Sequence, residues 1–132
     1  MNTTYKNHKP IKVLIVDDTH LILTAEKMIF ETAGCEAETA TNGFEALKLI
    51  NNDIKLVLTD IQMPGMRGDQ LAKKIRKKYP NVLVIGITAT FVEALKEIDQ
   101  SSLHALLQKP LQITTCHQLL NKINQMQSII AA

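Results

Sequence analysis

Five short strand-like runs, each followed by a segment with helical periodicity, constrain what this chain of 132 residues can fold into. The runs cover residues 11–16, 36–40, 54–59, 82–88 and 105–108. Strands that alternate with helices form a parallel sheet, because each right-handed crossover brings the chain back in the same direction and lays a helix on the sheet. The pattern therefore predicts an α/β fold: a doubly wound, five-stranded parallel sheet with flavodoxin-like (βα)5 topology and strand order 2-1-3-4-5.

The helical segments are expected to turn apolar faces toward this sheet. In the first of them the apolar residues recur at helical spacing and mark the face predicted to be buried: Leu21, Ile22, Ala25, Met28 and Ile29. Four further helices are marked in the same way by Ala46, Leu47 and Ile50, by Leu71, Ala72 and Ile75, by Phe91, Leu95 and Ile98, and by Cys116, Leu119, Leu120 and Ile123.

Composition limits the class of protein. Hydrophobic residues at 45% and charged residues at 21% are typical of one globular domain. We expect a flexible tail over 1–10, the domain over 11–127, and a tail or linker stub over 128–132. A net charge of +2 does not indicate nucleic acid as a direct partner. Residues 1–10 lack the apolar core of a secretory signal and no apolar stretch is long enough for a membrane span, so we expect a cytoplasmic protein.

Polar residues stand where four of the predicted strands end. Asp17 and Asp18 follow the first strand, Asp60 the third, Thr88 the fourth and Lys109 the fifth. Each residue alone is common at a turn, but the carboxyl ends of parallel strands meet at one edge of the sheet. The five side chains are therefore expected to converge on one crevice.

The chemistry of such a set is narrow. Carboxylates that repel one another are commonly held by a hard divalent cation, and oxygen ligands without His or Cys favour Mg²⁺ over zinc. Lys109 and the Thr88 hydroxyl would neutralise the oxygens of a transferring phosphoryl group. Asp60 is then the expected nucleophile, which would form an aspartyl phosphate.

The residues that carry this pattern also resemble a known family. The strings Val-Leu-Ile-Val-Asp-Asp at 13–18, Leu-Thr-Asp-Ile-Gln-Met-Pro-Gly-Met at 58–66, Ile-Thr-Ala at 87–89 and Lys-Pro at 109–110 closely resemble the receiver domain of two-component response regulators. The resemblance covers about residues 11–127. The sequence Asp-Ile-Gln-Met-Pro at 60–64 is also similar to that of receivers attached to hybrid histidine kinases.

The resemblance implies a signalling switch rather than an enzyme with an external substrate. It implies that Asp60 is the phosphoacceptor, Thr88 the switch hydroxyl and Lys109 the phosphate-pairing lysine, with the Lys109-Pro110 bond commonly cis. It also implies Mg²⁺ as cofactor, with Asp18, Asp60 and the backbone carbonyl of Gln62 as direct ligands and Asp17 acting through water. A histidine kinase or a histidine phosphotransfer protein is the implied partner.

Two departures from the family pattern affect how phosphorylation is read out. Receivers often carry Tyr or Phe three residues before the lysine, where this chain has Leu106, and the usual Gly-Ala before the fifth strand is replaced by Ser102-Leu103. Dimer or target contacts are expected on the face formed by the helix over 91–98, the strand over 105–108 and the last helix.

Three other functions remain open at this point. A degenerate receiver could act as a scaffold, although its acidic set is intact. A phosphohydrolase with an aspartyl intermediate typically has an acid–base Asp two residues after the nucleophile, where this chain has Gln62. A flavin-binding electron carrier would carry a Ser, Thr and Gly-rich loop after the first strand, which is absent here. Within the receiver hypothesis, we expect Gln62 and Thr19 to influence the lifetime of the phosphorylated state.

Overall fold

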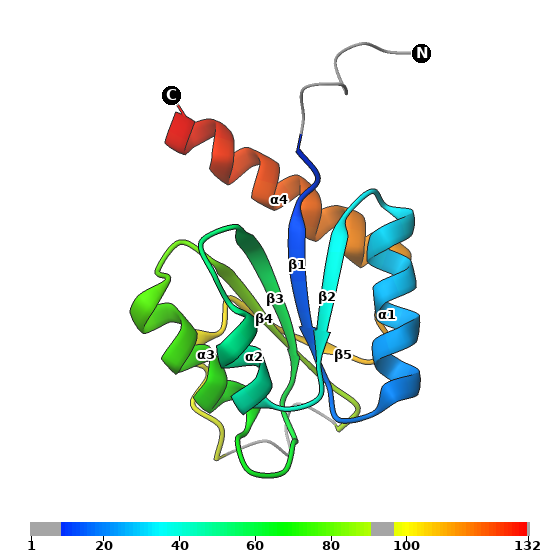
Figure 1. The fold of residues 1–132 in the computed structure, drawn as a ribbon, viewed down its shortest axis with the longest axis vertical. Helices are drawn as coiled ribbons and strands as arrows, with labels where there is room; N and C mark the ends of the chain where they lie inside the picture. Colours follow the sequence, from blue (N-terminus) through cyan, green and yellow to red (C-terminus); the bar gives the residue numbers. More distant parts are fainter. Residues whose placement is uncertain (1–8, 91–96, 132) are drawn as a thin grey trace.

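The computed structural model describes residues 9–90 and 97–131, with side chains described up to residue 127. Its five strands are parallel and lie in the order β2-β1-β3-β4-β5 (Figure 1). Their bounds are Lys12–Val16 (β1), Glu36–Ala40 (β2), Ile54–Asp60 (β3), Leu83–Thr88 (β4) and Ala105–Gln108 (β5). The predicted fold class and strand order are confirmed.

The helices alternate with these strands. They are α1 (His20–Thr32), α2 (Gly43–Leu49), α3 (Gly68–Lys78), the short 3₁₀ helix η3 (Gln100–Ser102) and α4 (Ile113–Ala131). The helix predicted from Phe91, Leu95 and Ile98 falls largely on residues 91–96, outside the described residues. Helix α4 continues past residue 127, where the sequence analysis places the end of the domain. In the described part of the chain, no helix combines the length and the apolar character needed to cross a lipid bilayer.

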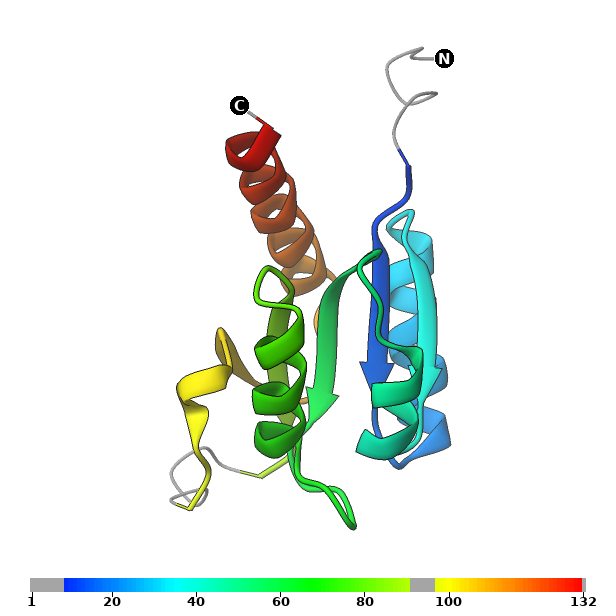
Figure 2. The ribbon, with the colours of Figure 1, turned by 60° about the vertical axis from the view of Figure 1, so that its left-hand side comes forward.

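Two apolar layers hold the helices on opposite faces of the sheet (Figures 1 and 2). Alternate residues of a strand point to opposite faces, so Val13 and Ile15 of β1 join one layer and Leu14 and Val16 join the other. The first layer receives α1 and α4, and the second receives α2 and α3. The central strands are buried on both sides, which leaves only the ends of the sheet for a polar site.

Helix α1 does not bury the face that the sequence predicted. Leu21 is 81% exposed and Met28 is 62% exposed, whereas Leu23, Glu26 and Phe30 are the buried residues. These three residues, spaced at i, i+3 and i+7, form the stripe that meets the sheet. The prediction was wrong because apolar residues occur nearly all round this helix, and the inward stripe contains a glutamate that a search for apolar periodicity passes over.

The two edges of the sheet are short and partly polar. Edge strand β2 alternates exposed Glu36 and Glu38 with partly or fully buried neighbours. At the other edge, the peptide N–H of His104 donates to the carbonyl of Val84 (2.8 Å), and the N–H of Val84 donates to the imidazole Nδ1 of His104 (3.0 Å). The His104 side chain therefore supplies a hydrogen-bond acceptor to β4 just before β5 begins.

Candidate functional site

Three carboxylates meet at the carboxyl ends of β1 and β3. These strands are hydrogen-bonded neighbours, with Val16 opposite Thr59, so Asp17 and Asp60 follow directly at the same level of the sheet. Asp17, Asp18 and Asp60 each offer an oxygen, and these oxygens lie within 4.8 Å of one another. Asp17 and Asp60 are buried, whereas Asp18 is exposed. The three carboxylates therefore lie close together at this edge of the sheet.

Lys109 reaches this cluster from the end of β5. Its Nζ lies 2.6 Å from Oδ2 of Asp17 and 3.6 Å from Oδ1 of Asp60. The backbone brings it there: the N–H of Lys109 donates to the carbonyl of Thr88 (2.7 Å), and the Lys109-Pro110 bond is cis, as the resemblance implied. Burial lowers the pKa of the ammonium, but the hydrogen bond to Asp17 and the charge of Asp60 outweigh it, so the pKa is raised. One positive charge therefore stays beside three carboxylates.

The protonated form of Asp60 is more stable in the folded protein than it would be in water, so the pKa of this side chain is raised. Burial, followed by repulsion from Asp17, raises the pKa of Asp60 from 3.8 to about 6, although Lys109 acts in the opposite direction. The carboxylate still dominates at neutral pH, since neutral pH lies above this value. A partly desolvated carboxylate of this kind retains its charge for attack on an electrophile and gains from any cation placed beside it.

The backbone of Asp60 is fixed by the beginning of α3. The N–H of Gly68 donates to the carbonyl of Ile61 (2.9 Å), which closes the loop between β3 and α3. A Cβ at position 68 would collide with the carbonyl oxygen of Asp60. Only glycine allows this approach, so the residue that begins α3 also sets the position of the acceptor strand end.

The residues that follow β4 are joined to the loop that follows β3. Thr88 is buried, and its Oγ1 accepts a hydrogen bond from the N–H of Thr90 (3.1 Å). The Thr90 hydroxyl donates to Oε1 of Gln62 (2.8 Å), whose side chain is exposed. The N–H of Thr19 donates to Oδ1 of Asp17 (2.9 Å). Sequence reasoning missed Thr90, which no motif singles out and whose importance depends on a contact 28 residues away.

A fourth carboxylate, missed by sequence reasoning, lies behind the cluster. Glu26 of α1 is 3% exposed, and neither of its side-chain oxygens has a hydrogen-bond partner among the described residues. Burial, followed by the charge of Asp17, raises its pKa from 4.5 to about 7, and Lys109 acts against this rise. The sequence signal that could have revealed Glu26 is its position between Leu23 and Phe30 at helical spacing, which places a glutamate on an apolar stripe.

The donor set fits a magnesium ion. Hard oxygen donors suit Mg²⁺, which usually keeps several waters and takes only one or two protein carboxylates directly. Exposed Asp18 and nearly buried Asp60 offer such oxygens at the mouth of the cluster. Buried Asp17 is already engaged by Lys109 and by the Thr19 N–H, which agrees with the expected indirect role. The ligand roles of these residues and of the Gln62 carbonyl stay predictions.

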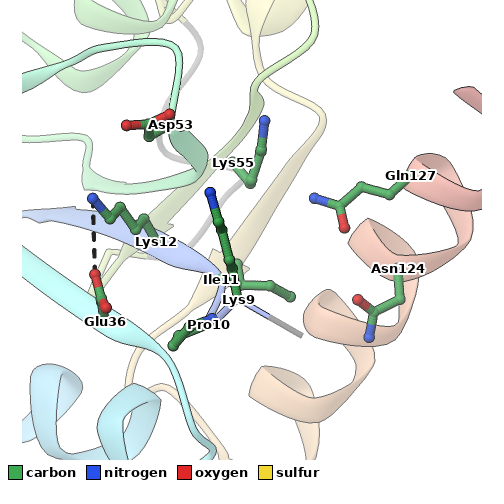
Figure 3. Close-up of a pocket in the computed structure, with 9 residues that line it drawn as sticks. All are labelled: Lys9, Pro10, Ile11, Lys12, Glu36, Asp53, Lys55, Asn124 and Gln127. Atoms are coloured by element: carbon green, nitrogen blue, oxygen red, sulfur yellow. Dashed lines mark ion pairs between the residues drawn. The ribbon is translucent and has the colours of Figure 1, made fainter. Parts of the chain in front are cut away.

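A cavity of about 660 Å³ lies at the opposite end of the sheet from the acidic cluster. Figure 3 shows the residues that line it. It is lined at the amino ends of the strands by Lys12, Glu36 and Lys55, and Asn124 and Gln127 of α4 face it. Lys12 and Glu36 form an ion pair across 3.8 Å, and their charges largely offset each other. The acidic cluster, where three carboxylates and Lys109 converge, is therefore the better candidate for chemistry.

Comparison with known proteins gives matches over most of the chain. The model of the response regulator receiver domain matches residues 13–121. Hybrid signal transduction histidine kinase L from Dictyostelium discoideum is 32% identical over 121 residues, which cover 84% of this chain and 7% of that protein. Two-component response regulator ARR22 from Arabidopsis thaliana is 36% identical over 108 residues, which cover 78% of this chain and 76% of that protein.

A solved structure agrees with these matches. The complex of response regulator protein TrrA from Thermotoga maritima with Mg²⁺-BeF has a TM-score of 0.75 at 30% identity, and the match covers 86% of this chain and 98% of that chain. The match thus spans nearly the whole solved chain of TrrA and a small part of the hybrid kinase.

Proposed function

This chain belongs to the response regulator receiver domain family, and on that premise we propose that Asp60 accepts a phosphoryl group from a phosphohistidine and so switches a surface of the domain. The observation that carries the proposal is the ammonium group of Lys109, which is shared between Asp17 (2.6 Å) and Asp60 (3.6 Å). Such an arrangement neutralises a phosphorylated carboxylate without adding a competing nucleophile.

The proposed step is an in-line displacement at phosphorus. An oxygen of Asp60 forms the new P–O bond while the P–N bond of phosphohistidine breaks, and the electron pair of that bond goes to the imidazole nitrogen, which takes up a proton. Hydrolysis later restores the carboxylate when water attacks phosphorus and inorganic phosphate leaves. The domain assists both steps on its own side chain, as a switch.

Each neighbour of Asp60 has a proposed role. Lys109 pairs with the phosphoryl oxygens, and it can turn toward them when the charge of Asp17 is offset by another cation. The buried Thr88 hydroxyl has its oxygen engaged by the N–H of Thr90, so its proton is available to a phosphoryl oxygen. When bound by Asp18, Asp60 and the Gln62 carbonyl, with Asp17 acting through water, Mg²⁺ would supply charge neutralisation for the transferring group.

Partners and location follow as further proposals. Receiver domains take phosphate from histidine kinases or histidine phosphotransfer proteins, and we propose such a donor for this domain in the cytoplasm. We keep 11–127 as the proposed functional unit with tails on either side. A direct nucleic-acid contact is not proposed. The dimer or target face expected around β5 and α4 includes residues 91–96, which lie outside the described residues.

The test uses the full chain, Mg²⁺ and acetyl phosphate, followed by intact mass. We expect a gain of one phosphoryl group that disappears with EDTA or with Asp60→Asn. Asp53→Asn is the matched control, because Asp53 is exposed just before the amino end of the same strand. A gain that persists in Asp60→Asn would place the acceptor elsewhere. No gain from acetyl phosphate or from a phosphorylated histidine phosphotransfer protein would instead support the scaffold hypothesis.

A further inference from the structure

Helices α2 and α3 lie side by side on one face of the sheet (Figure 1). A groove is lined by residues of these two helices and of the loop after β3. Its volume is about 550 Å³, within the range of about 300–1,000 Å³ found for ligand clefts. We call it the Phe44 groove. It is lined by Phe44, Gly65, Met66, Gln70, Lys73, Lys74 and Lys77.

Phe44 gives the groove an exposed apolar centre. It is 57% exposed, although a phenylalanine side chain gains several times the thermal energy from burial. Its ring lies against the loop: a methyl group on Gly65 would sit 3.2 Å from Cε2 of Phe44. Met66 is buried beneath and forms part of the second apolar layer. The ring therefore lies beside the loop backbone, next to a buried methionine, and leaves more than half of its surface open to a contact from outside.

Three lysines border this centre, and the carboxylate of Asp99 lies near enough to Lys73 to be influenced by its charge. Lys73, Lys74 and Lys77 are exposed, and none of them takes part in an ion pair within residues 9–90 and 97–127. Two acids near Phe44 and the lysines in the sequence have other partners. Glu45 accepts a hydrogen bond from the Thr41 hydroxyl, and Asp69 forms an ion pair with Arg67.

Helix capping explains only part of this charge. Cations stabilise a helix within its last turn, which for α3 contains Arg76, Lys77 and Lys78. Lys73 and Lys74 lie before that turn, so their presence beside Phe44 calls for another explanation. Lysine stems also extend the apolar floor while their ammonium groups reach solvent.

We propose that the Phe44 groove binds an acidic segment of a partner protein, which places one large apolar side chain against Phe44 and carboxylates beside Lys73, Lys74 and Lys77. A single exposed aromatic residue with a cationic rim is typical of protein contacts that depend on one anchor residue. A nucleic acid is the less suitable occupant, because one ring offers no row of stacking platforms for successive bases.

The test is an NMR titration of the full, unphosphorylated chain at low salt. The probe is a short peptide with one tryptophan flanked on both sides by glutamates, together with forms in which the tryptophan is serine or the glutamates are glutamine. We expect saturable shifts at Phe44, Gly65 and Lys73 with the first peptide. Either change to the peptide should weaken binding by about tenfold or more.

Protein variants locate the site. Phe44→Ser should weaken binding by about tenfold, and Lys73→Glu combined with Lys77→Glu should abolish it. The matched controls are Ile113→Ser and Lys122→Glu, which are equally exposed changes on α4 and should leave binding intact. Thermal unfolding verifies that each variant is folded. The proposal fails if no peptide binds saturably, if Phe44→Ser binds normally, or if an oligothymidine displaces the peptide. None of these outcomes bears on Asp60.

Discussion

Replacing Glu26 with glutamine should remove much of the pH dependence of folding stability. The carboxyl of Glu26 is buried, has no hydrogen-bond partner among the described residues, and is influenced by Asp17, Lys109 and Asp60. In the unfolded chain its pKa is near the ordinary value of 4.5, whereas in the folded protein it is about 7. The folded state therefore binds this proton more tightly than the unfolded state.

The sign and size of the effect follow from linkage. A raised pKa contributes stability in full below pH 4.5, and this contribution is lost as the pH rises through about 7. At about 1.36 kcal/mol per pKa unit, the difference between 4.5 and about 7 is worth roughly 3 kcal/mol. Most of this falls between about pH 5 and pH 8, where wild type should lose stability relative to Glu26→Gln.

The assay is urea unfolding at a series of pH values with EDTA present, since a bound metal would change the charge beside Glu26. Asp60 titrates over a neighbouring range, because its pKa is also raised, to about 6. Both proteins are therefore compared again in an Asp60→Asn background, which isolates the Glu26 contribution. Parallel pH profiles for wild type and Glu26→Gln in both backgrounds would refute the reasoning.

Three further predictions use other contacts. Burial lowers the pKa of His104, so its neutral ring should stabilise β4 above pH 6.5 and lose this effect as the pH falls. His104→Ala should cost about 1 kcal/mol at pH 8 and, in urea unfolding, should remove the part of the stability loss below pH 6.5 that is due to His104. Gly68→Ala should displace the Asp60 carbonyl, lower stability by about 1–3 kcal/mol and reduce phosphorylation measured by intact mass. Gln62→Ala should slow release of inorganic phosphate from the phosphorylated domain, and Thr90→Val should reproduce part of this change by freeing the same amide. An unchanged release rate in Gln62→Ala would contradict the last prediction.

Most of the fold could be predicted from the sequence because strands buried on both faces have a simple signature. The segments β1, β3 and β4 are mostly apolar and almost wholly buried, and Gly86 lies inside β4. A Cβ at Gly86 would lie 2.7 Å from Ile61 Cδ1 and 3.0 Å from Leu106 Cδ1. Leucine in place of an aromatic residue thus fills the space above Gly86, a tertiary fact that no local pattern contains.

Some residues of the candidate site could be predicted from the sequence, and Glu26 could not. Strand ends predicted Asp17, Asp18, Asp60, Thr88 and Lys109, since parallel topology alone gathers them. Glu26 was missed because helical periodicity is sought among apolar residues only. Which side of α1 is buried depends on how the helix packs on the sheet, and the sequence of the helix alone does not give that packing.

The edges of the sheet also determine how copies of this domain can meet. Exposed edge strands offer unpaired peptide groups to other chains, and natural proteins protect them with charge and short length. Edge strand β2 has five residues and carries Glu36 and Glu38, while β5 at the other edge has four. Two β2 strands brought together would face like charge, and β5 offers few peptide groups for pairing. Pairing of edge strands between copies is therefore disfavoured even in concentrated solution.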